Sequence, residues 1–288
     1  MSKITLVLTM NYITSKIAKE ILNSQSEEIF LNLDLNKTEK KEKILIDREK
    51  KIAKFPEGDV SFDILKKIAK DEGHIYFIKD GEVFKAAISN NGYYKLVPTI
   101  PPTIEINGIR MHRTKEVNPY EDTLNKINAV KVKKGEKVLD TCMGLGYTAI
   151  EAYRRGAEVI TIEKNPNVLE LAKINPYSEE LFKGGIKIIL GDAYDVIKRF
   201  KDEEFDVVIH DPPRFSLAGH LYSEEFYKEI FRVLKPGGRL FHYVGNPGKK
   251  YRGKDLQKGV MERLRKVGFV NVKRVEEALG VVAVKPRD

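Results

Sequence analysis

The second half of the chain alternates short apolar runs with helix-like segments, and this alternation constrains the fold most strongly. The apolar runs are KVLD (137–140), EVITIEK (158–164), IKIILGDA (186–193), FDVVIHD (205–211) and RLFHYVG (239–245). Each run precedes a helix-like segment, which predicts an α/β fold with a doubly wound, Rossmann-like parallel sheet. Residues 270–286 add two strands without a helix between them. This ending predicts an antiparallel hairpin at one edge of a seven-stranded sheet.

The first hundred or so residues follow another pattern and predict a smaller α+β domain. We expect strands over 4–10, 27–35 and 92–97, helices over 14–22 and 61–71, a lysine-rich hairpin over 36–55 and a tight hairpin turn at Asp80-Gly81. Prolines 98, 101 and 102 break this pattern, so we place the domain junction nearby. The prediction is an N-terminal domain over 1–108, a candidate for RNA binding, and a second domain over 109–288 that opens with a helix around 121–129.

Charge and cysteine content narrow the possible classes of protein. The chain has 51 Lys and Arg against 42 Asp and Glu, a net charge of +9. This excess fits a phosphate-bearing partner such as RNA, and a thermophile-type surface rich in Lys and Glu explains it equally well. The single cysteine, Cys142, excludes an internal disulfide framework and a multi-cysteine zinc site, and we expect no metal. No apolar run approaches bilayer length and no signal-peptide cleavage pattern is present, so we expect a cytoplasmic protein without a membrane partner.

Four successive predicted strands end in an acid. These acids are Asp140, Glu163, Asp192 and Asp211, and the first is followed by Gly144 and Gly146. The carboxyl ends of parallel strands meet at the edge where such sheets bind their ligands. One acid there would be ordinary, but four in register make a set of merely solvated carboxylates improbable. The glycines allow a tight turn and a close approach of the backbone to a ligand.

This pattern resembles the class I S-adenosylmethionine-dependent methyltransferases, and the resemblance covers roughly Asn118 to the C-terminus. It implies S-adenosyl-L-methionine as the cofactor. The implied cofactor-binding residues are Asp140, Gly144 and Gly146 for the methionine part, Glu163 for the ribose, and Asp192 and Ala193 for the adenine. Thr141, Lys164 and, in the lead-in segment, Tyr120 are further implied cofactor-binding residues. One departure is Cys142, which stands where the family often has a further glycine.

A nicotinamide cofactor is the main competitor for this loop. The fingerprint G-x-G-x-x-G is not met, although Ala149 at the third position leaves the option open by spacing alone. A dinucleotide scheme gives no role to Asp192 or to the sequence DPP (211–213). These residues favour S-adenosylmethionine.

The sequence HDPPRFS (210–216) follows the fourth strand and predicts the substrate side of the site. An exocyclic base amine is a poor nucleophile, because its lone pair is delocalised into the ring. The Asp211 side chain and the Pro212 carbonyl can hold such an amine, and Pro212 and Pro213 fix the backbone without offering donors. Amine methyltransferases carry a similar signature of acid or Asn, Pro, Pro and an aromatic residue. We therefore predict Asp211, Pro212 and Pro213 as catalytic residues.

Substrate contacts are expected on both sides of this segment. Arg214 stands where related enzymes place the aromatic residue and Phe215 is displaced by one position, so either can stack on a base and Arg214 can hold a phosphate. The loop after the fifth strand carries Lys249, Lys250 and Arg252, which suit phosphate contacts or form a solvated loop. We expect His210 and His242 to be structural. Methylation at cytosine C5 is disfavoured, because it uses a cysteine nucleophile and Cys142 lies in the cofactor loop.

The leading hypothesis is a methyltransferase acting on an RNA base amine, similar to archaeal RNA N-methyltransferases with a DPP motif. Cytidine N4 in ribosomal RNA is the most specific candidate, with guanine N2 and ring nitrogens as alternatives. The second hypothesis is a spermidine synthase-like aminopropyltransferase, which residues 221–238 resemble, or another small-molecule methyltransferase. Arg214 would repel a polyamine. A third hypothesis, a non-catalytic RNA-binding protein, conflicts with the intact acids. The oligomeric state stays open.

Overall fold

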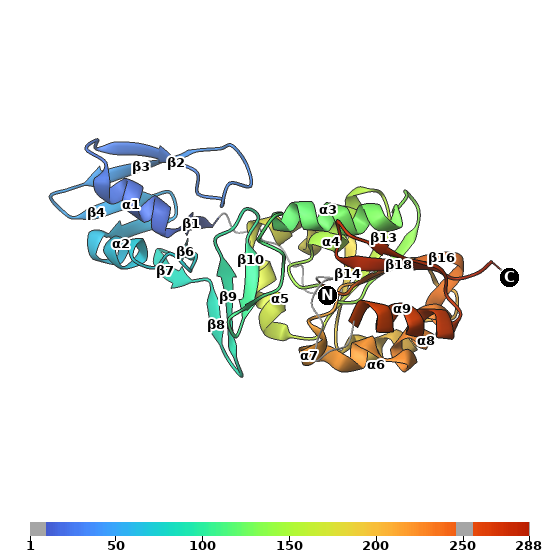
Figure 1. The fold of residues 1–288 in the computed structure, drawn as a ribbon. Coiled ribbons are helices and arrows are strands. Elements are labelled where there is room, and N and C mark those ends of the chain that lie inside the picture. The colour runs from blue at the N-terminus through green and yellow to red at the C-terminus, as the bar shows by residue number, and fades with distance from the viewer. Residues whose placement is uncertain (1–9, 246–255, 288) are drawn as a thin grey trace. The chain divides into compact units, whose positions relative to one another are not determined.

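The computed structural model describes residues 10–245 and 256–287, and the chain divides into two compact units. One unit comprises Met1–Pro119 together with Glu170–Glu179, and the other comprises Tyr120–Leu169 and Glu180–Asp288. The strand expected over 4–10 lies, apart from Met10, outside the described residues. Figure 1 follows the chain from the blue N-terminal elements to the red C-terminal ones.

The first unit is built from three small antiparallel sheets and two helices. The sheets have the strand orders β1-β6-β7, β2-β3-β4-β5 and β11-β10-β9-β8. The strands are β1 (Asn11–Ile13), β2 (Glu28–Leu31), β3 (Glu42–Asp47), β4 (Ile52–Phe55), β5 (Gly58–Ser61), β6 (Tyr76–Lys79), β7 (Glu82–Lys85), β8 (Ala87–Ser89), β9 (Tyr93–Val97), β10 (Thr103–Ile106) and β11 (Ile109–Arg110). The helices α1 (Ser15–Asn23) and α2 (Phe62–Ala69) are capped by Thr14 and Ser61, whose side chains accept from the backbone N–H three residues on. The α+β character predicted for this region is confirmed.

Two local features of this unit differ from the sequence prediction. The strand expected over 27–35 ends at Leu31, because the Asn32 Oδ1 atom accepts from the Asp34 and Asn36 amides and turns the chain there. The proline-rich segment after β9 does not end the sheet. Strand β10 follows it and pairs with β9 through Ile104 and Leu96.

The second unit is a seven-stranded sheet with helices on both faces, as predicted. The strands are β12 (Lys137–Asp140), β13 (Glu158–Glu163), β14 (Ile186–Leu190), β15 (Phe205–His210), β16 (Leu234–Tyr243), β17 (Val270–Val275) and β18 (Gly280–Val284), in the order β14-β13-β12-β15-β16-β18-β17. Strand β18 is antiparallel to both β16 and β17, whereas the remaining neighbours are parallel. The antiparallel hairpin at one sheet edge is thereby confirmed.

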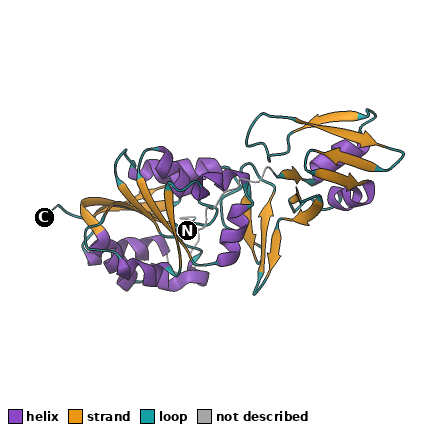
Figure 2. Ribbon diagram, turned by 180° about the vertical axis from the view of Figure 1, so that it is seen from behind, coloured by secondary structure: helices purple, strands orange, loops and turns teal. Residues whose placement is uncertain are grey.

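Helices cover the sheet from both sides. The helices are α3 (Pro119–Val130), α4 (Tyr147–Arg154), α5 (Pro166–Lys173), α6 (Ala193–Val196), α7 (Phe215–Ala218), α8 (Glu224–Val233) and α9 (Leu256–Val267), with 3-10 helices η1 (Pro176–Phe182), η2 (Ile197–Arg199) and η3 (Gly219–Tyr222). Figure 1 shows α3 and α4 on one face of the sheet and α6, α8 and α9 on the other. Figure 2 shows the strands enclosed between these two helical layers.

Strand β16 begins five residues earlier than the sequence pattern indicates. Its register against β15 shifts between the pairs Phe205–Leu234 and Val207–Arg239, so the Pro-Gly-Gly segment lies in a bulge of the strand. Gly237 has a φ of +77°, and a Cβ on Gly238 would lie 2.7 Å from the Lys235 carbonyl oxygen. The two glycines therefore let the bulge close, whereas α8 ends before them at Val233.

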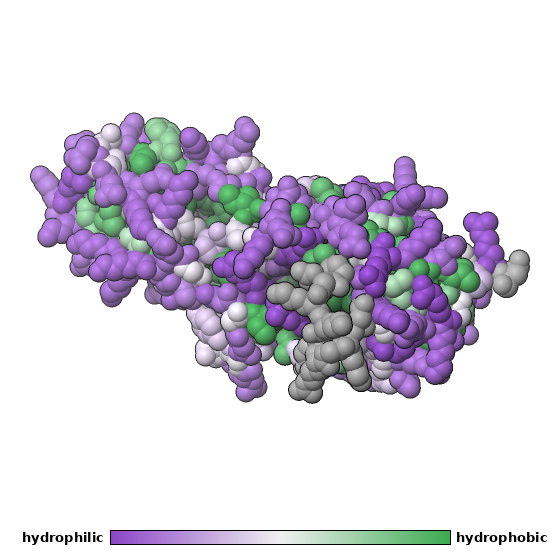
Figure 3. Space-filling model, in the orientation of Figure 1, coloured by the Kyte–Doolittle hydropathy of each residue, from purple (hydrophilic) through white to green (hydrophobic). Residues whose placement is uncertain are grey.

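The core of the second unit lies between β12, β15, β16 and the helices α8 and α9. Phe205, Phe226, Tyr227 and Leu240 are fully buried there. The surface seen in Figure 3 is mainly hydrophilic, with small separate apolar areas. Across residues 10–245 and 256–287, the structure has no helix long and apolar enough to cross a bilayer.

We predict that Phe226→Ala lowers the free energy of unfolding by about 3 to 5 kcal/mol, because it leaves a cavity beneath the sheet. Phe226 is 0% exposed and its ring centroid lies 5.0 Å from that of His210. Val270→Ala on the exposed side of β17 is the control and should change this free energy by less than about 1 kcal/mol. Urea denaturation followed by circular dichroism measures both, and equal losses would show that Phe226 is not a core residue.

Candidate active site

The chain reverses its direction of travel through the sheet on either side of β12. From β12 it proceeds outward to β13 and β14, then returns to β15 on the other side of β12 and continues to β16. Such a reversal opens a crevice at the carboxyl ends of the two strands that flank it. Asp140 ends β12 and Asp211 directly follows β15, so these two carboxylates stand on either side of the crevice. Glu163 and Asp192 follow along the same edge, as the strand ends predict.

The glycine loop between β12 and α4 is shaped by two left-handed residues. Gly144 and Gly146 have φ angles of +56° and +80°. A Cβ on Gly144 would meet open space, whereas a Cβ on Gly146 would lie 2.2 Å from the Leu181 Cδ1 atom. The Gly144 amide donates to the Glu163 Oε2 atom at 2.9 Å, which joins the loop to the end of β13. Backbone conformation thus selects glycine at both positions, and packing does so only at Gly146.

Asp140 is a buried carboxylate whose two oxygens have unequal surroundings. The Thr161 hydroxyl donates to Oδ2 at 2.7 Å, while Oδ1 is buried without a hydrogen-bond partner among the described residues. Burial, with the nearby Asp211 charge, raises the pKa of Asp140 to about 7, against hydrogen bonds from Thr161 and Thr148 that lower it. A buried acceptor of this kind calls for a donor from a ligand, and a cationic donor would also stabilise the charge. The site therefore fits the ammonium-bearing methionine part of S-adenosylmethionine.

The next two acids are held by backbone amides. Glu163 accepts from the Gly144 and Asn165 amides, and burial raises its pKa. Asp192 caps α6 by accepting from the Tyr194 amide at 2.9 Å, and Ala193 is the buried first residue of that helix. The carboxylates thus face the edge in fixed orientations, as hydroxyl and amine recognition requires.

Lys164 forms an ion pair with Asp192, although Glu163 is its neighbour in the sequence. Its ammonium is 2.8 Å from the Asp192 Oδ2 atom, and the His220 Nε2 atom lies 3.4 Å from the same oxygen. Burial works against the charge on Asp192, but the bonds from Lys164 and from the Tyr194 amide lower its pKa overall. Because the Lys164 side chain is 69% exposed, this pair exchanges readily with solvent or a ligand.

Asp211 forms an ion pair with Lys126, a residue that was not predicted from the sequence. The Lys126 ammonium on α3 donates to the Asp211 Oδ2 atom at 2.6 Å and lies 2.7 Å from the Asp122 Oδ2 atom. It also faces the Tyr243 ring at 4.9 Å. The only sequence signal is the i,i+4 spacing of Asp122 and Lys126, which ordinarily describes a solvated helix face. Here that face is turned to the sheet edge.

The DPP segment presents its two prolines differently. The Tyr222 hydroxyl donates to the Pro213 carbonyl at 3.0 Å. Pro212 is buried, and none of the described residues donates a hydrogen bond to its carbonyl. Of the two proline carbonyls, that of Pro212 is therefore the one without a donor among the described residues.

The two residues after the prolines are exposed to solvent. Arg214 is exposed, and Phe215 is 37% exposed with its ring edge-on to Tyr222 at 5.4 Å. Tyr120, at the start of α3, is 44% exposed. Lys249, Lys250 and Arg252 lie outside the described residues. Their predicted phosphate contacts stay predictions.

The two histidines of this edge are buried and serve the scaffold. The Leu221 carbonyl can only accept, so the His210 Nε2 atom donates to it at 2.9 Å and Nδ1 is left to accept from the Thr141 hydroxyl at 2.7 Å. Burial lowers the pKa of His210 to about 3, which keeps the ring neutral. His242 contacts the Tyr227 hydroxyl through Nε2 at 2.8 Å. The Thr141 side chain therefore supports His210.

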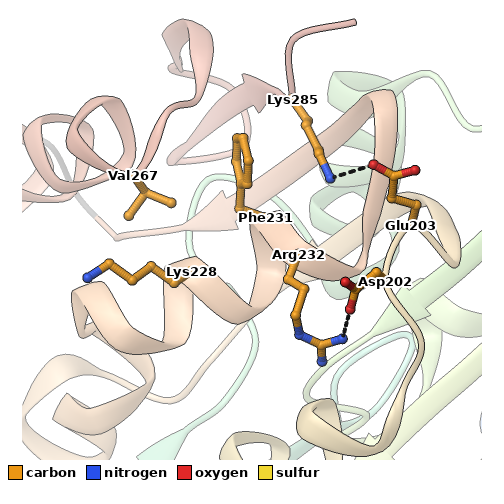
Figure 4. Close-up of a pocket in the computed structure, with 7 residues that line it drawn as sticks. All are labelled: Asp202, Glu203, Lys228, Phe231, Arg232, Val267 and Lys285. Carbon is orange, nitrogen blue, oxygen red and sulfur yellow. Dashed lines mark hydrogen bonds and ion pairs between the residues drawn. The ribbon is translucent and has the colours of Figure 1, made fainter. Parts of the chain in front are cut away.

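A separate depression of about 320 Å³ lies at the other end of β15 (Figure 4). It is lined by Asp202, Glu203, Lys228, Phe231, Arg232, Val267 and Lys285. Its charged groups form ion pairs. The Arg232 Nη1 atom lies 2.7 Å from the Asp202 Oδ1 atom, and the Lys285 Nζ atom lies 3.4 Å from the Glu203 Oε1 atom. Since Asp202 and Glu203 precede β15 while Asp211 follows it, this depression is remote from the crevice. The described residues contain no group of three or more His, Cys, Asp or Glu that could hold a metal ion.

The second unit is similar in sequence to known methyltransferases and to an aminopropyltransferase. Residues 132–268 match the family model described as a methyltransferase domain. A ribosomal RNA large subunit methyltransferase I of Aeromonas hydrophila is 29% identical over 165 residues, which cover 52% of this chain and 42% of that protein. A polyamine aminopropyltransferase 2 of Aquifex aeolicus is 24% identical over 176 residues, or 58% of this chain and 35% of that one. The chain thus spans less than half the length of these curated relatives.

Solved structures share the fold. A spermidine synthase in complex with the transition-state analogue AdoDATO superposes with a TM-score of 0.56 at 22% identity, covering 72% of this chain and 77% of that chain. At this identity the likeness concerns the fold alone. Together with the match to the methyltransferase-domain model over residues 132–268, it shows that the second unit has the Rossmann-like methyltransferase fold.

We predict that Gly146→Ala weakens binding of S-adenosylhomocysteine by about tenfold to a hundredfold, because the added methyl group must displace Leu181. Gly144→Ala is the matched control, since it carries the same backbone strain without the clash and should weaken binding less. The double variant G146A/L181A should approach the affinity of Gly144→Ala. Isothermal titration calorimetry measures all three, and equal affinities of the two single variants would contradict the packing argument.

We predict that Asp140→Asn removes a pH dependence from folding. The pKa of Asp140 is raised from 3.8 to about 7 in the folded chain. Its contribution is therefore full below pH 3.8 and is lost as the pH rises through about 7. The free energy of unfolding of the wild type, relative to Asp140→Asn, should fall over that range by at most about 1.4 kcal/mol per pH unit.

Urea denaturation at several pH values measures this difference. Asp195→Asn serves as the control, because the Asp195 side chain is 68% exposed. A difference between wild type and Asp140→Asn that is constant with pH would show that Asp140 stays ionised in the folded chain.

Proposed function

We propose that the chain is an S-adenosylmethionine-dependent methyltransferase that acts on an RNA base amine, with cytidine N4 of ribosomal RNA as the most specific candidate. The observation that carries this proposal is the position of Asp211 and the Pro212 carbonyl, two acceptors beside Asp140 at the crevice. The Aeromonas relative, whose name specifies ribosomal RNA, supports an RNA substrate. An RNA substrate also agrees with the net charge of +9 and with the predicted cytoplasmic location.

The cofactor, when bound, supplies an activated methyl group. In the proposed site Asp140 and the glycine loop hold its methionine part, Glu163 its ribose, and Asp192 with Ala193 its adenine. These assignments agree with the buried, donor-poor Oδ1 atom of Asp140 and with the cap geometry of Asp192. The chain's own contribution on this side is binding and orientation.

On the substrate side, the proposed chemistry depends on acceptors. A carboxylate oxygen of Asp211 and the Pro212 carbonyl would accept from the two N–H groups of the amine and turn its lone pair toward the methyl group. Proline at both positions fixes the direction of the carbonyl. Phe215 would stack on the base and Arg214 would contact a phosphate, because both are exposed beside the crevice.

The aminopropyltransferase reading is the second candidate, favoured by the Aquifex relative and by the spermidine synthase fold. A polyamine substrate needs acids that hold its ammonium groups. Here Asp211 is followed by two prolines and an exposed arginine, and one of its oxygens already binds the Lys126 ammonium. The immediate surroundings of Asp211 therefore suit a neutral amine better than a polycation.

The direct test is transfer of label from S-adenosylmethionine to RNA. The RNA should come from cells that lack this gene, and the products should be digested to nucleosides. Labelled N4-methylcytidine would support the proposal in full, and label on guanine N2 would support RNA methylation but replace the base. Unlabelled RNA, with aminopropyl transfer to a polyamine from decarboxylated cofactor, would overturn it.

We predict that Asp211→Ala abolishes methyl transfer while the affinity for S-adenosylhomocysteine stays within about threefold of the wild type. Asp206→Ala is the matched control, because Asp206 lies on the same strand at its other end and pairs with Lys235 at 2.8 Å. This control should transfer methyl groups normally. Loss of cofactor binding in Asp211→Ala would assign Asp211 to the cofactor side.

A further inference from the structure

We propose that Lys126 is a positioning residue for the transfer reaction. It holds the Asp211 carboxylate by Oδ2 and so leaves the other oxygen to accept from the substrate amine. This inference rests on the proposed function, since it concerns the same acceptor. It assigns a role in the site to α3, which precedes the sheet.

The contacts of Lys126 fix its ammonium from three sides. The distances are 2.6 Å to the Asp211 Oδ2 atom, 2.7 Å to the Asp122 Oδ2 atom and 4.9 Å to the Tyr243 ring centroid. Side-chain exposure is 3% for Lys126 and 1% for Asp122, but 20% for Asp211. The ammonium therefore lies behind the carboxylate, and the accessible part of Asp211 lies on the side away from it.

The charges explain why an ammonium is needed there. Two carboxylates close to one buried point repel each other, and one ammonium between them leaves a single net negative charge. The pKa of Asp211 is raised overall, because burial and the Asp122 charge outweigh Lys126, which lowers it. For Lys126 itself, burial works against the charge, but Asp211 and Asp122 raise its pKa well above the usual range. Lys126 thus favours the ionised form of Asp211, and only an unprotonated carboxylate can serve as an acceptor on both oxygens.

Other ionisable groups also face Asp211. They are Asp140 from β12, Cys142 from the glycine loop and Tyr222 from η3. Each contributes negative charge when ionised, so each opposes ionisation of Asp211. Among the described residues whose charges are coupled to Asp211, Lys126 is the cation.

The test compares three variants. Lys126→Met removes the ammonium and leaves two buried carboxylates. Lys126→Met/Asp122→Asn removes one charge of each sign, so the cluster keeps its net charge of −1 but loses the bond to Oδ2. Asp122→Asn keeps that bond and removes a neighbouring negative charge. Lys137→Met is the control, because Lys137 donates to Glu204 at 2.8 Å at the opposite end of the sheet.

The expected readouts are a single-turnover rate, its pH profile and the affinity for S-adenosylhomocysteine. The double variant should transfer about tenfold more slowly or worse with unchanged cofactor affinity. The acidic limb of the profile should move up by about one pH unit or more in Lys126→Met and down in Asp122→Asn. Full activity in the double variant would overturn the proposal. An acidic limb that does not shift in Lys126→Met or in Asp122→Asn would also overturn it.

One measurement separates this inference from the proposed function. The titration of the Asp211 carboxyl carbon, assigned with Asp211→Asn and followed by NMR, needs no substrate. If the wild type methylates no RNA, the proposed function fails. The titration then still decides whether Lys126 holds Asp211 ionised, and an unchanged titration in Lys126→Met would refute the pairing itself.

Discussion

The candidate site depends on the reversal of strand order at β12. Strands β13 and β14 lie on one side of β12, and β15 and β16 lie on the other. The strand ends that carry Asp140 and Asp211 therefore face a common crevice. The pairing of β12 with a strand on each side fixes this arrangement, since Asp140 pairs with Thr161 of β13 and with Ile209 of β15. A slip by one residue would turn these side chains to the opposite face. The apolar packing of the central strands is therefore what places the polar groups.

Much of this arrangement follows from local sequence. The strand–helix alternation predicts the sheet, and the acids at the strand ends predict the ligand edge, because strand ends are local features. The antiparallel hairpin at the sheet edge follows from two strands without an intervening helix. The predicted roles of the individual acids stay predictions, although the structure does bring Asp140, Glu163, Asp192 and Asp211 to one edge.

Contacts between distant segments could not be predicted in the same way. Lys126 and Asp211 are 85 positions apart, and nothing in the helix sequence distinguishes an i,i+4 pair that faces solvent from one that faces the sheet. Lys164 follows Glu163 in sequence, but its long flexible side chain reaches the acid on the next strand. Thr141 contacts His210, which lies 69 positions away and bonds to Leu221 of η3. These contacts share one cause, which is that side-chain partners are set by tertiary packing.

The two sides of the crevice differ in how their charges are balanced. Asp211 has a counter-charge within the chain, from Lys126, which it shares with Asp122. Asp140 interacts only with hydroxyl groups, those of Thr161 and Thr148, and has no cationic partner among the described residues. A buried carboxylate without a counter-ion favours a cationic ligand, which lowers its pKa on binding and so becomes linked to proton release. S-adenosylmethionine carries positive charge on both its sulfonium and its amino group. The two sides of the crevice thus differ in charge balance, because Asp211 has a cationic partner in Lys126 and Asp140 has none among the described residues.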